Sequence, residues 1–96
     1  MGDEQLDGLL DDDILSSSAF SKLRWRCRRG LLENDLFIER LFNRHANVLT
    51  VGQARGMYAL MELADNDLLD VLLGRPHTHT VTQDPRVQSV LRLFKV

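Results

Sequence analysis

Several residue types and patterns are scarce in this sequence of 96 residues, and each scarcity excludes a class of protein. The single cysteine, Cys27, permits no internal disulfide and no cysteine-based metal cluster. No apolar stretch approaches the roughly 20 residues of a transmembrane helix, so we expect no membrane insertion. The first residues lack both an apolar signal core and the arginines of a transit peptide, and a cytoplasmic protein is therefore expected.

Motifs for nucleotide binding are also missing. The chain has no G-x-G-x-x-G pattern after a strand and no P-loop, so direct carriage of FAD or another nucleotide is not predicted. A single domain of this length has a thin core, which leaves little room for a deep cofactor cavity. We therefore expect one small domain that holds no cofactor and is not an enzyme.

Basic residues are absent from the first thirteen positions, which hold six of the 14 acidic residues. We expect residues 1–16 to be an acidic, flexible tail and residues 17–96 to be the folded domain. The rest of the chain has a net charge of about +4, and five of its bases lie between Lys22 and Arg29. An acidic segment on a basic body indicates a charged partner or partial masking of the basic surface.

Helical periodicity is what the sequence does have. Apolar residues recur three and four positions apart in five segments, and no segment alternates as a strand does. The expected helices cover about 17–29, 31–45, 51–64, 66–73 and 85–94, with a loop over 75–83 and the third helix most buried. Their predicted N-terminal signals are Ser17 or Ser18, Thr50, Asp65 or Asn66, and Asp84 before Pro85. The prediction is an all-α, five-helix bundle.

The segment from Leu23 to Glu33 is the most unusual part of the chain. It places Trp25 and four arginines at the end of a helix, just before Gly30, which breaks or bends the chain. Tryptophan and arginine dominate the hot spots of protein interfaces, and the guanidinium fork suits carboxylates and phosphates. The segment therefore predicts a recognition surface; the alternative is a solvated basic face with one buried tryptophan.

The same segment carries the pattern W-x-C-R-R-G-x-x-E-x-D, formed by Trp25, Cys27, Arg28, Arg29, Gly30, Glu33 and Asp35. In this pattern the chain resembles the succinate dehydrogenase FAD assembly factors, the flavinylation factors of bacteria and mitochondria, whose hallmark is R-G-x-x-E. The resemblance extends from Leu23 to Phe94. It departs from many relatives at Val71, where an aromatic residue is expected, and it does not include the acidic N-terminal extension.

This resemblance implies a binding protein that promotes covalent attachment of FAD to a histidine of the succinate dehydrogenase flavoprotein subunit. The fumarate reductase flavoprotein is a plausible second client, and we expect the free assembly factor to be a monomer. The resemblance assigns client binding to Arg29, Gly30 and Glu33, with Trp25 and Arg28 as flanking candidates. A helper of this kind need only position its client, because the client and the flavin supply the chemistry.

Other chemistry is less favoured by the sequence. Cys27 shares an apolar stripe with Leu23, so we expect a buried thiol and not a nucleophile activated by His45. The pair His77 and His79 lacks a cysteine or acidic companion at metal-binding spacing, and no metal site is predicted. The bases at 22–29 could form a small nucleic-acid-binding module instead, although a pI near 5.8 and one basic segment disfavour it.

Overall fold

The computed structural model describes residues 6, 8–28, 32–45, 48–76 and 78–94. Within these ranges the chain forms five α-helices and no β-strand, which confirms the all-α, five-helix prediction. The elements in order are α1 (Ser17–Arg26), α2 (Leu32–Arg44), α3 (Val51–Leu60), α4 (Asp65–Leu72), the 3₁₀ helix η2 (Thr80–Gln83) and α5 (Pro85–Phe94). Among the described residues, no helix is long and apolar enough to cross a membrane.

Helix α3 forms the centre of the fold. Seven of its ten residues are buried, which confirms that this helix is the most buried of those described. It packs most closely against α5, because Gly56 presents no side chain at their contact. A Cβ at Gly56 would lie 2.7 Å from the carbonyl carbon of Arg86, so the two backbones are in direct contact there.

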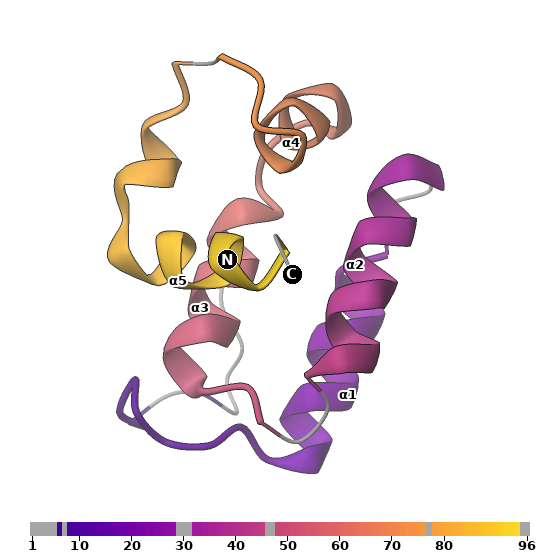
Figure 1. The fold of residues 1–96 in the computed structure, drawn as a ribbon. Coiled ribbons are helices and arrows are strands. Elements are labelled where there is room, and N and C mark those ends of the chain that lie inside the picture. The colour runs from indigo at the N-terminus through magenta and orange to yellow at the C-terminus, as the bar shows by residue number, and fades with distance from the viewer. Residues whose placement is uncertain (1–5, 7, 29–31, 46–47, 77, 95–96) are drawn as a thin grey trace.

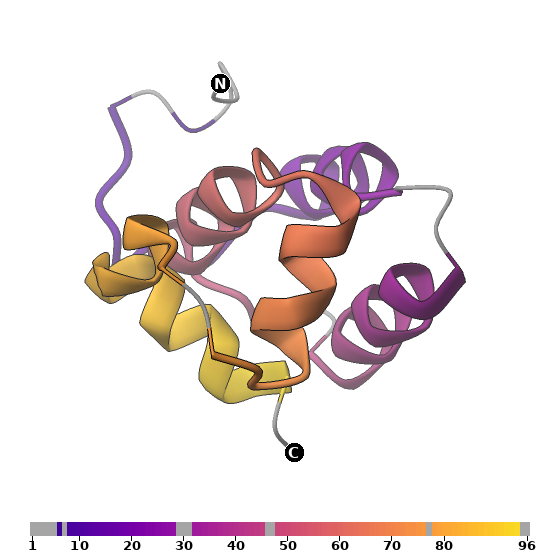
Figure 2. The ribbon, with the colours of Figure 1, turned by 90° about the horizontal axis from the view of Figure 1, so that it is seen from above.

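The other helices enclose this pair. Figure 1 shows α1 and α2 side by side on one flank, with α3 and α5 on the other. Seen from above in Figure 2, α4 lies over the middle of the molecule, between α2 and α5. Phe20 of α1 and Phe42 of α2 meet edge to face with ring centroids 5.5 Å apart, and this contact joins the first two helices.

The helix boundaries agree with the sequence in part. Thr50 caps α3 as predicted, since its side chain accepts from the Gln53 amide at 3.2 Å and the Gln53 side chain accepts from the Thr50 amide at 3.0 Å. Helix α5 begins at Pro85, also as predicted. Helix α1 is instead capped by Ser16, whose hydroxyl accepts from the Ala19 amide, and it ends at Arg26.

Two further boundaries were predicted wrongly. Helix α3 ends at Leu60, four residues before the expected Ala64. Ala64 then occupies the N-cap of α4, and neither Asp65 nor Asn66 does. No side-chain hydrogen bond caps the start of α4. Acidic side chains in its first turn, including Asp65, stabilise this end of the helix electrostatically instead. The predicted loop over 75–83 contains the short helix η2.

Residues 8–16 form a segment that we call the N-terminal strap, which runs beneath α3 before α1 begins (Figure 1). Its backbone carbonyls accept hydrogen bonds from amides in the first turn of α3, which have no partner within the helix. The Asp13 carbonyl accepts from the Val51 amide at 2.8 Å, and the Asp11 carbonyl accepts from the Gly52 amide at 2.9 Å. Leu15 of the strap is buried, as is Leu6 before it. Residues 1–16 were expected to be a solvated tail; the described part of that segment makes these contacts instead.

A carboxylate holds the strap against two helices. Asp11 Oδ1 lies 2.6 Å from the guanidinium of Arg55 on α3, and Asp11 Oδ2 lies 2.8 Å from that of Arg86 on α5. Hydrogen bonds from Arg86 and Arg55 lower the pKa of Asp11 below its usual range. Arg55 also donates to the carbonyls of Leu6 and Leu9 at 2.9 Å, so one arginine holds both the strap and the residue Leu6 before it.

Candidate functional site

The predicted motif residues lie where α1 ends and α2 begins. Trp25 is 73% exposed on α1, and Arg28 is exposed two residues beyond the end of that helix. Glu33 is exposed in the first turn of α2. Arg29 and Gly30 lie outside the described residues. The expectation of a buried tryptophan, which accompanied the alternative of a solvated basic face, is therefore wrong.

The described arginines of this region differ in their surroundings. Arg24 points to α2, where its guanidinium lies 2.6 Å from Glu39 Oε2 and donates to Asn43 Oδ1 at 3.2 Å. The hydrogen bond to Glu39 raises the pKa of Arg24 above its already high ordinary value. Arg26 and Arg28 are exposed instead. Arg24 is thus part of the contact between α1 and α2, and the described exposed arginines lie closer to the junction.

A small concavity opens beside this junction. It has a volume of about 190 Å³ and is lined by Arg28, Asp35, Ile38 and Glu39. Its lining includes the basic Arg28 and the acidic Asp35 and Glu39, so charged side chains of either sign on a partner can form ion pairs here. Asp35, the last residue of the sequence pattern, therefore lines the same concavity as Arg28 of that pattern.

A larger depression, the α2/α4 groove, begins at Glu33 and has a volume of about 450 Å³. Helix α2 supplies Glu33, Leu36, Phe37 and Arg40, and the α4 side supplies Leu69, Leu73 and Arg75. Sequence reasoning missed all of these except Glu33. One signal was available: Leu36 and Phe37 lie off the core stripe of α2 that Ile38, Leu41 and Phe42 form.

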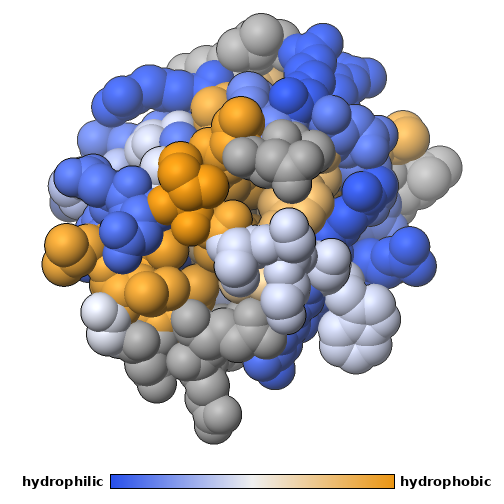
Figure 3. All heavy atoms as spheres, turned by 90° about the horizontal axis from the view of Figure 1, so that it is seen from below, coloured by the Kyte–Doolittle hydropathy of each residue, from blue (hydrophilic) through white to orange (hydrophobic). Residues whose placement is uncertain are grey.

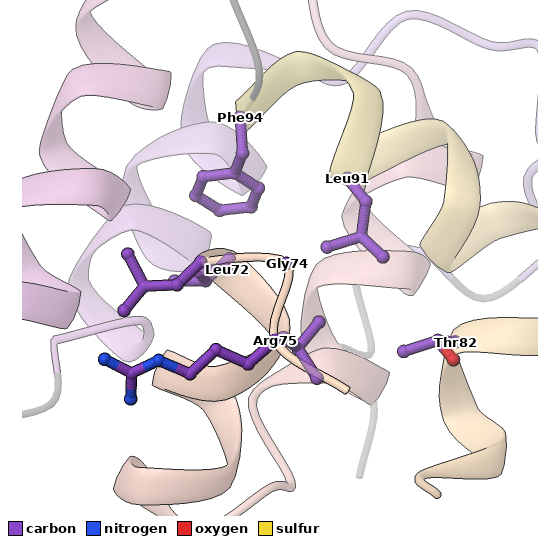
Figure 4. A pocket seen from close by; sticks show the side chains of 8 residues that line it. Leu72, Gly74, Arg75, Thr82, Leu91 and Phe94 are labelled. Carbon is purple, nitrogen blue, oxygen red and sulfur yellow. The ribbon is translucent and has the colours of Figure 1, made fainter. Parts of the chain in front are cut away.

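A third concavity, of about 330 Å³, lies between the end of α4, η2 and α5. Figure 4 shows Leu72, Leu91 and Phe94 around its apolar side, with Thr82 across from Leu72 and the Arg75 side chain extending away from Thr82. Leu73 and Arg75 also line the α2/α4 groove, so the residues after α4 separate the two hollows.

The residues considered for catalysis or metal binding have structural surroundings. The Cys27 thiol forms no disulfide and has no exposed surface, which confirms that it is buried and denies it access to a substrate. The Nε2 atom of His79 lies 3.5 Å from Oδ1 of Asp67, while His77 is outside the described residues. The described residues contain no group of three or more metal-binding side chains.

Asn34 is a buried polar residue that sequence reasoning also missed. Its side-chain amide donates to the Asp65 carbonyl at 2.9 Å, which ties the first turn of α2 to the start of α4. The contact fixes the relative position of the two helices on either side of the α2/α4 groove. Its neighbour Glu33 is thereby held at the end of that groove.

Exposed aromatic and charged side chains at a helix junction, next to open hollows, are typical of proteins that bind other proteins. The chain belongs to the family described as "Flavinator of succinate dehydrogenase", which residues 21–95 match.

Curated relatives agree with this assignment. The "FAD assembly factor SdhE" of Ralstonia nicotianae is 45% identical over 75 residues, which cover 78% of this chain and 79% of the relative. The protein of the same name from Coxiella burnetii is 32% identical over 74 residues, 77% of this chain and 85% of the relative. That from Aliivibrio fischeri is 26% identical over 78 residues, 81% of this chain and 91% of the relative. No solved structure matches.

Proposed function

We propose that this protein binds the flavoprotein subunit of succinate dehydrogenase and promotes the covalent attachment of FAD to it. The observation that carries the proposal is the family match over residues 21–95, which spans the helix junction and all five helices apart from the start of α1. The relatives' printed name, FAD assembly factor, supports the same role. We propose the fumarate reductase flavoprotein as a second client.

In this proposal the client contacts the junction between α1 and α2. Trp25, Arg28 and Glu33 support it because all three are exposed on the same part of the fold. Arg29 and Gly30 complete the proposed interface from the connecting residues. A side chain larger than hydrogen at Gly30 would add a steric block between the helper and its client.

The chemistry of attachment belongs to the client and its flavin. A client histidine must be held against a methyl carbon of the flavin while negative charge develops on the ring, and both groups lie in the flavoprotein. The helper contributes by holding the client in the geometry that favours this step. We therefore propose a non-catalytic protein that acts in the cytoplasm as a monomer and needs no cofactor of its own.

The Glu33→Ala variant tests the proposed interface. Glu33 is exposed, so its removal should leave the melting temperature nearly unchanged. As an interface hot spot it should contribute about 2 kcal/mol to client binding, a loss of about thirtyfold in affinity. Calorimetric titration of the purified flavoprotein subunit would measure this loss.

Asp12→Ala is the matched control, because Asp12 is an exposed acidic residue of the strap, and Figure 1 shows the strap at the end of the molecule opposite the start of α2. It should bind the client as the wild type does. A large loss of stability in Glu33→Ala with unchanged affinity would contradict the interface role. Strongly salt-dependent binding to random duplex DNA, without binding to the flavoprotein, would instead support a nucleic-acid-binding module at residues 22–29.

A further inference from the structure

Helix α2 has a second apolar surface in addition to its core face. Ile38, Leu41 and Phe42 are buried in the core, whereas Leu36 is 59% exposed and lines the α2/α4 groove. A single exposed leucine is ordinary on a protein surface. Here Leu73, which is 45% exposed, lines the same groove from the other side. The two leucines therefore form one apolar surface inside a depression.

The charges on the groove are separated along its length. Glu33 stands in the first turn of α2, and Arg40 follows two turns later, about 10 Å along the helix axis. Arg75 contributes a second guanidinium from the opposite side, where Asp70 lies 3.1 Å from it. The groove is thus acidic at the end nearest the helix junction and basic further along.

Glu33 connects this groove to the proposed client interface, because it belongs to both. A client that contacts Glu33 lies at the mouth of the groove. Protein interfaces combine an apolar centre with a polar rim, and this groove has that composition. Its occupant is therefore expected on the client, in continuity with the contact at Glu33.

We propose that the α2/α4 groove receives a segment of the flavoprotein client that presents an apolar side chain to Leu36 and Leu73. An acidic side chain of the same segment pairs with Arg40, since Arg75 already lies against Asp70. This inference rests on the proposed function and extends it, because it adds a second contact region to the helix junction. The junction and the groove together hold the client at two points, which fixes its orientation better than one contact does.

Leu36→Glu tests the apolar part of this proposal. Glutamate is a strong helix former, so α2 should persist, and the exposed position should leave the melting temperature close to that of the wild type. A charge in the apolar contact should weaken binding of the purified flavoprotein subunit by at least about tenfold. Val48→Glu is the control, because Val48 is also 59% exposed but does not line the groove. It should bind within about twofold of the wild type.

Val48, the control position, belongs to a different exposed apolar surface. Hydrophobic atoms also gather on the face seen from below in Figure 3. The strap and the segment before α3 lie at that end of the molecule and carry the exposed Leu10, Ile14 and Val48. If any exposed apolar surface served the client, Val48→Glu would weaken binding as much as Leu36→Glu does. That result would overturn the assignment to the groove.

Arg40→Ala and Arg44→Ala test the proposed ion pair between the groove and an acidic side chain of the client. Both arginines are exposed on α2, but only Arg40 lines the groove. Arg40→Ala should weaken client binding about threefold to tenfold, with a smaller effect at high salt, whereas Arg44→Ala should not weaken it. Equal affinities for the two variants would overturn the pairing with an acidic client residue.

These outcomes separate the groove from the proposed function. If Glu33→Ala weakens binding while Leu36→Glu matches the wild type, the groove proposal is overturned and the junction remains the interface. If the wild-type protein does not bind the flavoprotein at all, both are overturned. Should Leu36→Glu fail to fold, Leu36→Gln keeps the helix propensity without a charge, and its affinity decides the question in the same way.

Discussion

Asp11 illustrates how a residue that looks solvated in the sequence can have a defined place in the structure. Its carboxylate bridges Arg55 and Arg86, which lie 44 and 75 positions away along the chain. No local pattern relates these three residues, so the contact could not be predicted from the sequence. The exposure of Trp25, in contrast, agrees with its proposed role as a flanking residue of the client interface, because such a residue need not be buried in the free protein.

The contribution of Asp11 should depend on pH. Its folded-state pKa is lowered from the ordinary 3.8 by Arg86 and Arg55, so its stabilising effect is present above the unfolded-state pKa. It is lost as the pH falls through the lowered folded-state value. Asp11→Asn should therefore be less stable than the wild type at neutral pH, and the difference should shrink below about pH 4.

Urea unfolding at a series of pH values would measure this difference. Asp12→Asn is the control, since Asp12 is the exposed neighbour in the strap, and it should follow the wild type across the range. A difference between Asp11→Asn and the wild type that does not change between neutral and acidic pH would contradict an ionic role for Asp11.

The positions of the helices along the chain were predicted better than their exact ends or the pairs of helices that pack together. The apolar spacing located the centres of all five helices, because each has one face in the core. The ends depend on which nearby hydroxyl reaches an orphan amide, and Ser16 does so where Ser17 or Ser18 was expected. The α2/α4 groove depends on which helices become neighbours, and helical periodicity carries no such information.

The crossing of α3 and α5 provides a test at the same scale. Gly56→Ala would place a Cβ against the Arg86 carbonyl, where backbone cannot yield as a flexible side chain can. We expect a loss of about 1–3 kcal/mol of stability from overpacking. Thermal unfolding followed by circular dichroism should show a fall of about 4–8 °C in melting temperature for each kcal/mol.

The sign of this change is informative by itself. Alanine is a better helix former than glycine by about 1 kcal/mol, so the substitution would stabilise an α3 with free space at this position. A higher melting temperature for Gly56→Ala would therefore contradict the close backbone contact between α3 and α5.

At the scale of the whole molecule, the proposed client-binding residues that the structure describes, Trp25, Arg28 and Glu33, lie where α1 ends and α2 begins. The buried core centres on α3, and the strap lies at the end of the molecule opposite the start of α2 (Figure 1). The motif was found from the sequence because its spacing is local. The α2/α4 groove, which Glu33 of the motif also lines, was found only from the fold.

The central claim is that this chain promotes flavinylation through the junction motif. The most direct test is covalent flavin fluorescence of the succinate dehydrogenase flavoprotein on a denaturing gel, from cells that lack this protein and from cells that express it. Our expectation is a band that is lost on deletion, restored by the wild type and by Asp12→Ala, and not restored by Glu33→Ala or Gly30→Arg. Equal bands in all these cells would contradict it.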